Sequence, residues 1–118
     1  MHRLGYFTLE TPDIARARVF YAALLGWRWD EASSLSTYLH VEADGHAGPA
    51  FGIVRGEKKD FSNLYFQVED VDAACAKVVA LGGRAAIPAD SASGRSVTVS
   101  DDQGVSFGLW QAADGMAG

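Results

Sequence analysis

The chain has 118 residues, 48% of them hydrophobic, which suits a single domain with its own core. Its 15 acidic and 10 basic residues give a formal net charge of −5 without a basic stripe, so nucleic acid is not an expected partner. With no run of 18 apolar residues and no signal-peptide layout, we expect a cytoplasmic protein that has no membrane partner. The single cysteine, Cys75, excludes an internal disulfide and a multi-cysteine zinc site.

The first half of the sequence predicts a strand, a helix and three further strands. Residues 4–10 alternate, and Thr11-Pro12-Asp13 then supplies a helix cap, a proline suited to the first turn and an early acid. Gly26 ends the helix, whose apolar stripe is Ile14, Ala17, Tyr21 and Leu24. Strands are expected at residues 27–30, 37–42 and 50–55, which makes residues 1–56 a βαβββ module.

The second half predicts the same order after a charged, aperiodic link at residues 55–62. A strand at 64–69 precedes a helix that Asp70 begins and Gly82-Gly83 ends. Cys75 lies on the apolar stripe of that helix with Val71, Ala74 and Val78, so we expect it in the core. Strands at 84–89, 96–100 and 105–111, with a turn at 101–104, complete a second module over residues 61–112.

The two modules also resemble each other in sequence. Residues 50–54 (AFGIV) recur as residues 106–110 (SFGLW), and a strand ahead of Asp13 recurs ahead of Asp70. Gly108 follows Gly52 by 56 positions and Asp70 follows Asp13 by 57, so the offsets agree. Only two copies of so long a unit favour one closed α+β domain over an open repeat array.

The order of several short segments resembles the vicinal-oxygen-chelate superfamily, and within it the glyoxalase-like or bleomycin-resistance-like group of bacterial proteins. The segments are Thr11-Pro12-Asp13, Phe20-Tyr21, Leu25-Gly26-Trp27, Val68 to Ala74, Leu81-Gly82-Gly83, Asp102-Gln103-Gly104 and Phe107 to Gln111. The resemblance covers nearly the whole chain. It implies a single α+β domain of two tandem βαβββ modules, whose sheets curl into one mixed sheet around a central cup with the helices on the convex side. It also implies a homodimer.

Strand alternation then separates residues that face the helices from residues that face the cup. Side chains such as Leu9, Leu64 and Phe66 are expected to face the helices. The predicted cup residues are Tyr6, Thr8 and Glu10, then Tyr38, His40 and Glu42, then Asn63, Tyr65 and Gln67, and finally Ser106, Gly108 and Trp110. This mixture of aromatic and polar side chains is typical of a small-molecule pocket. For Tyr6, Tyr65 and Trp110 both a pocket and a core position remain open.

The resemblance also implies where metal-dependent relatives hold their ion. Those positions fall at Tyr6, Gly52, Asn63 and Gly108, and none of these is a strong ligand for a divalent ion. We therefore predict no metal and no cofactor. His40 with Glu42 or Glu10 could form a different metal site because alternate residues share a strand face.

The resulting functional hypothesis is metal-independent binding of a small aromatic or amphipathic molecule. The predicted ligand-binding residues are Tyr6, Thr8, Glu10, His40, Asn63, Tyr65, Gln67, Gly108 and Trp110. No catalytic residue is assigned. One alternative is a lyase, isomerase or dioxygenase that uses a relocated metal or an acid–base pair such as His40 with Glu10. Another is a subunit or sensor module whose cup no longer binds a ligand.

Overall fold

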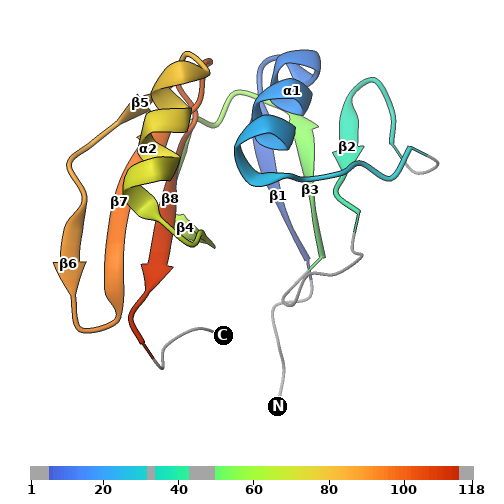
Figure 1. The fold of residues 1–118 in the computed structure, drawn as a ribbon. Coiled ribbons are helices and arrows are strands. Elements are labelled where there is room, and N and C mark those ends of the chain that lie inside the picture. Colours follow the sequence, from blue (N-terminus) through green and yellow to red (C-terminus); the bar gives the residue numbers. More distant parts are fainter. Residues whose placement is uncertain (1–5, 32–33, 43–49, 115–118) are drawn as a thin grey trace. The chain divides into compact units, whose positions relative to one another are not determined.

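The computed structural model describes residues 6–31, 34–42 and 50–114, and it has the predicted α+β class with two helices and mixed sheets (Figure 1). The chain divides into two compact units, residues 1–58 and 59–118. Each unit contains one described helix and its own sheet. Neither of these helices has the length and apolar character needed to cross a membrane.

The sheet of the first unit has the strand order β1-β3-β2. Strand β3 pairs in parallel with β1 and in antiparallel with β2. The strand predicted at residues 27–30 is wrong, because that segment pairs with its neighbour only through an isolated bridge between Trp29 and Val41. The bounds of the strands are Tyr6–Thr11 for β1, Tyr38–His40 for β2 and Ala50–Arg55 for β3.

Helix α1 (Ile14–Leu25) has an aspartate as its N-cap and a glycine as its C-cap. The N-cap is Asp13, whose Oδ1 accepts a hydrogen bond from the Arg16 amide at 3.1 Å. Thr11, the expected cap, is instead the last residue of β1, and its buried hydroxyl donates to the Asp13 carbonyl. Gly26 ends the helix as predicted, with a φ of +70° that a residue with a side chain rarely adopts.

The sheet of the second unit follows the order β4-β8-β7-β5, with β6 paired to β7. As in the first unit, the first strand pairs in parallel with the last, and the remaining pairs are antiparallel. The strand expected at 84–89 is divided into two short ones, and the expected link is too long because β4 starts at Asp60. The strands are β4 (Asp60–Gln67), β5 (Arg84–Ala85), β6 (Ala89–Ser91), β7 (Gly94–Ser100) and β8 (Ser106–Ala112).

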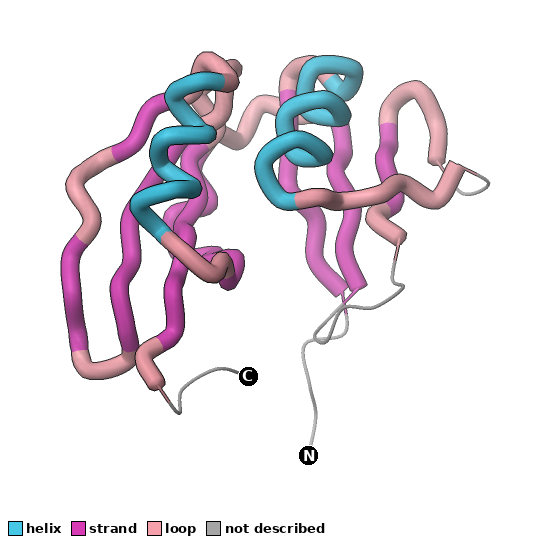
Figure 2. Tube along the Cα trace, in the orientation of Figure 1, coloured by secondary structure: helices cyan, strands magenta, loops and turns pink. Residues whose placement is uncertain are grey.

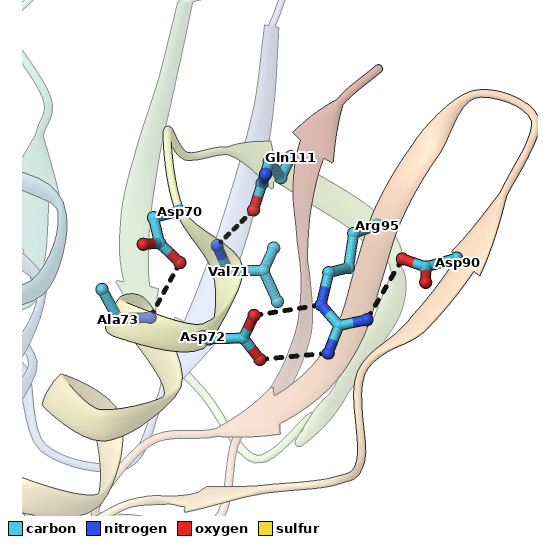
Figure 3. Close-up of polar contacts among 7 residues, drawn as sticks. All are labelled: Asp70, Val71, Asp72, Ala73, Asp90, Arg95 and Gln111. Carbon is cyan, nitrogen blue, oxygen red and sulfur yellow. Dashed lines mark hydrogen bonds and ion pairs between the residues drawn. The ribbon is translucent and has the colours of Figure 1, made fainter.

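Helix α2 (Val71–Ala80) is fastened to the sheet of its unit at its first turn (Figure 3). The N-cap Asp70 accepts from the Ala73 amide, and the Gln111 side chain of β8 accepts from the Val71 amide at 2.9 Å. Arg95 of β7 donates two hydrogen bonds to the Asp72 carboxylate and one to Asp90, each at 3.1 Å. These bonds connect the start of α2 to β6, β7 and β8.

The core of each unit lies between its helix and one face of its sheet (Figure 2). In the second unit the helix buries Val71, Ala74 and Val78, whereas Cys75 is only half-buried, so its predicted core position is wrong. The helix positions 72, 73, 76 and 77 are exposed, so Cys75 lies at the edge of the buried face of α2. Helix α1 contacts β2 and β3, and α2 contacts β5, β7 and β8, so within each unit the described helix covers only one sheet face.

Candidate ligand-binding site

The sheet face of the second unit that α2 leaves uncovered carries a row of polar and aromatic residues. On β8, Phe107 and Leu109 are buried, so Ser106, Gly108 and Trp110 point to the opposite face. The strand register places Ser96 of β7 and Gln67 of β4 on either side of Trp110. This is the alternation predicted for the cup residues of β8.

A pocket of about 340 Å³ lies on this face, lined by Tyr65, Ser93, Ser96 and Trp110. The indole Nε1–H of Trp110 donates to the Ser93 carbonyl at 3.1 Å, which fixes the ring and uses its only donor. The hydroxyl of Ser93 also shares a hydrogen bond with the Ser91 hydroxyl at 3.2 Å. The lining therefore combines the aromatic residues Trp110 and Tyr65 with two serines. Neither serine was predicted, because Ser96 faces Trp110 only through the β7–β8 register and Ser93 precedes β7.

Gly108 permits the Tyr65 ring to lie directly against strand β8. A Cβ atom added at Gly108 would sit 2.5 Å from Cδ2 and 2.7 Å from Cε2 of Tyr65. Such distances are shorter than any ordinary carbon contact, so a side chain at position 108 would require the Tyr65 ring to move. Gly108 thus affects the pocket by leaving room for the Tyr65 ring. Gly108 itself is not among the residues that line the pocket.

Asn63 and Gln67 are not among the residues that line this pocket. Both are exposed on β4. The register between β4 and β8 shifts between Phe61 and Tyr65, so Asn63 falls within a β-bulge and has no partner residue on β8. The bulge also turns Phe61 into the core although strict alternation would place it with Tyr65.

A second group of predicted cup residues gathers on the sheet of the first unit around Gly52. His40 and Thr8 are the partners of Gly52 on the two neighbouring strands. The position of a Cβ atom at Gly52 lies 2.5 Å from the Tyr38 hydroxyl oxygen and 2.7 Å from that of Tyr6. The ring centroid of His40 is 6.1 Å from the Tyr6 ring and 6.3 Å from the Tyr38 ring.

Glu10 and Glu42, the two glutamates considered with His40 as metal ligands, have polar contacts near strand ends. An oxygen of Glu10 accepts from the Lys58 amide at 3.4 Å, and Glu42 forms an ion pair with Arg28 at 3.1 Å. Within residues 6–31, 34–42 and 50–114, no three His, Cys, Asp or Glu side chains are placed to hold a metal ion. His2 and His46 lie outside the described residues.

The residues at the metal positions implied by the resemblance do not fit a metal ion. Gly52 and Gly108 offer no side-chain donor, and tyrosine side chains occupy the space above each of them. Asn63 lies in the β-bulge of β4. Tyr6, at the remaining position, has a phenol hydroxyl as its only side-chain donor atom. A divalent ion needs several oxygen or nitrogen donors that converge on one point, and this set supplies too few.

The profile of the glyoxalase-like domain family matches residues 6–110 of this chain. In sequence, the chain is 34% identical over 118 residues to a protein from Mycobacterium bovis named "Putative glyoxylase CFP32". The match covers 92% of this chain and 45% of that protein, and a protein of the same name from Mycobacterium tuberculosis matches equally. The chain therefore spans about half the length of the curated relatives it matches.

Three solved structures share the fold at low sequence identity. A glyoxalase/bleomycin resistance protein/dioxygenase family enzyme from Burkholderia phytofirmans has a TM-score of 0.74 at 16% identity, covering 95% of this chain and 100% of that one. The antibiotic binding protein TnmS3 from a Streptomyces species has a TM-score of 0.71 at 23% identity, covering 96% and 98%. The fosfomycin resistance protein FosX from Listeria monocytogenes has a TM-score of 0.73 at 20% identity, covering 96% and 95%. With the family profile spanning nearly the whole chain, this protein belongs to the glyoxalase-like domain family.

Proposed function

We propose that this protein binds a small, planar organic molecule without a metal ion. The observation that carries the proposal is the pocket of the second unit, where Trp110 and Tyr65 lie with two serines. Aromatic walls with a few polar groups are typical of small-molecule sites. Stacking on Trp110 and Tyr65 would supply most of the binding energy, and Ser93 and Ser96 would orient the ligand by hydrogen bonds.

The relatives support a small-molecule ligand in general terms. Proteins with this fold include one that binds an antibiotic and one that confers fosfomycin resistance. The absence of a fitting donor set at the metal positions supports metal-independent binding in this chain.

The further parts of the hypothesis concern the wider site and the assembly. We propose that the two modules form one domain with a shared cup, which Tyr6, Thr8, Glu10 and His40 would line from the first module. Asn63 and Gln67 would orient the ligand from exposed positions on β4. A homodimer in the cytoplasm also belongs to this hypothesis, and the mass of the protein in solution tests the dimer.

The test is a screen of planar aromatic compounds by calorimetry, followed by variants of the pocket. Trp110→Ala is expected to weaken binding of a hit roughly tenfold, because an aromatic contact contributes about 1 kcal/mol beyond its buried area. Trp29→Phe, in the other unit, is the matched control and should leave the affinity unchanged. If Trp110→Ala lowers the melting temperature strongly while the affinity stays the same, Trp110 is a structural residue and the assignment is wrong.

A second candidate function is an enzyme, and the name of the Mycobacterium relatives favours it. Elemental analysis of protein purified without added metal tests this candidate, together with thermal-shift titration of Ni, Zn, Mn, Co and Fe(II). Stoichiometric metal or a large specific stabilisation would contradict metal-independent binding and direct attention to His40, Glu42 and Glu10. No metal and no shift are expected.

A further inference from the structure

The turn between β6 and β7 contributes Ser93 to the Trp110 pocket. The carbonyl oxygen of Ser93 accepts two hydrogen bonds, one from the Trp110 indole Nε1–H at 3.1 Å and one from the Ala113 amide at 2.9 Å. Across the two strands of this turn, Arg95 donates to Asp90 at 3.1 Å, which holds β6 against β7 (Figure 3). A shift of the Ser93 carbonyl would therefore disturb the pocket ring and the backbone after β8 together.

The backbone of Gly94 sets the direction of that carbonyl. The loop between the paired residues Ser91 and Gly94 has only two residues, Ala92 and Ser93, and neither has a positive φ. The positive φ that such short hairpin loops normally need falls instead on Gly94, at +140°. The Ser93 carbonyl lies in the peptide plane that contains the Gly94 nitrogen, so the φ of Gly94 fixes how this plane is turned relative to β7.

The end of β8 leaves no room for a side chain at position 94. A Cβ atom there would overlap the Gln111 carbonyl oxygen and would lie 2.8 Å from the Ala113 amide nitrogen. Both atoms belong to the backbone, and the Ala113 amide is the second donor to Ser93. A side chain at position 94 would thus push apart the two segments whose contact holds the Ser93 carbonyl.

We infer that Gly94 is a positioning residue of the pocket, which fixes the Trp110 ring through the Ser93 carbonyl. The inference rests on the proposed function, because it treats Trp110 as the ring on which a ligand stacks. The ring is then held in place before a ligand arrives, so that no part of the binding energy is needed to order it.

The first measurement is the NMR signal of the Trp110 indole N–H, which requires no ligand. Trp110→Phe assigns this signal among those of the three tryptophans. Gly94→Ala should shift the signal and speed the exchange of the N–H with water by up to about tenfold, since the hydrogen bond to Ser93 is weakened or lost.

Gly83→Ala is the matched control for loss of stability. A Cβ atom at Gly83 would also meet a backbone oxygen, that of Ser100, but at the other end of β7 from the turn. This variant should be destabilised as Gly94→Ala is, and the chemical shift of the indole signal should stay unchanged. Equal shifts in both variants would mean that any destabilisation moves the ring, and the inference would be wrong.

The second measurement is the affinity for quinoline, a small planar probe, by calorimetry. Gly94→Ala should weaken quinoline binding by up to the roughly tenfold loss expected for Trp110→Ala, and Gly83→Ala should leave it unchanged. An unshifted indole signal in Gly94→Ala overturns the inference whether or not quinoline binds. A shifted signal in a protein whose parent form binds no quinoline contradicts the planar-ligand proposal instead, so the two failures give different results.

Should Gly94→Ala fail to fold, Ala113→Pro tests the same contact from the other side. Proline at position 113 has no amide hydrogen, so it removes the second donor to the Ser93 carbonyl. The indole signal of Trp110 should shift in this variant as well. An unchanged signal would show that the contact of the turn with the end of β8 does not position the ring, which would overturn the inference.

Discussion

At the scale of single residues, the glycines of this chain differ in what lies next to them. A Cβ atom at Gly83 would sit 2.3 Å from the Ser100 carbonyl oxygen, which belongs to the backbone of β7. At Gly108 the obstacle is the Tyr65 ring, which is 54% exposed and can swing away. A backbone obstacle cannot move without disturbing the sheet, whereas an exposed side chain can.

Gly83→Ala is therefore expected to destabilise the protein much more than Gly108→Ala. We expect a loss of about 1–3 kcal/mol for Gly83→Ala, as for other overpacked sites, and under about 1 kcal/mol for Gly108→Ala. Urea denaturation of the two variants checks the order. Equal losses would mean that Tyr65 is held as firmly as the backbone, contrary to its exposure.

Cys75 gives the protein a predictable dependence on alkaline pH. Burial raises the pKa of its thiol, the Asp72 carboxylate adds to the rise, and Arg95 opposes it. In the unfolded chain a cysteine thiol has a pKa of about 8.5, so as the pH rises the thiol of the unfolded state loses its proton first. The contribution of this thiol to the free energy of unfolding is therefore fully present below about pH 8.5, and it is lost as the pH rises through the pKa of the folded state.

Cys75→Ala should remove this part of the pH dependence. Urea midpoints at pH 7, 8, 9 and 10 should fall less steeply in the variant than in the parent protein. Tyr38, whose pKa is also raised by burial, adds a similar loss only above about pH 10. Parallel curves for variant and parent would show that the thiol titrates alike in both states.

At the scale of elements, the two helices begin in the same way. Asp13 and Asp70 have nearly identical backbone angles, with φ of −137° and −144°, and each accepts from the amide three residues later at 3.1 Å. This equivalence matches the sequence offset between the two modules. The sequence predicted Asp70 as a cap correctly and placed the first cap at Thr11 because threonine is also a favoured cap.

Asp13→Ala and Asp70→Ala should each cost about 1 kcal/mol of stability, since each leaves an amide of the first turn without its partner. Asp13→Ser and Asp70→Ser should recover most of the loss because serine can also accept at the cap. Chemical denaturation of the four variants provides the measurement. If an alanine variant is as stable as the parent, the cap does not contribute in solution.

At the scale of the whole molecule, the two cap variants test the proposal of a single domain. One domain unfolds in one cooperative step, so a destabilising substitution in either unit should shift the same unfolding transition. We expect Asp13→Ala and Asp70→Ala to lower a single melting temperature, and the double variant to lower it further. Differential scanning calorimetry is the measurement. Two transitions, each sensitive to one variant, would show that the units at residues 1–58 and 59–118 unfold separately.

The sequence by itself determined the α+β class, both helices with their glycine ends, the turn at residues 101–104 and membership of the glyoxalase-like domain family. These features depend on local signals and on the order of short segments, and both are legible in one chain. Tertiary structure alone decided the division of the strand at residues 84–89, the bulge that holds Asn63, and the serines beside Trp110. Each of these depends on which strand lies opposite, and a one-residue change of register turns a side chain to the other face. The hydroxyls above Gly52 meet for the same reason, since their strands are far apart in sequence and are neighbours of β3 only in the folded sheet.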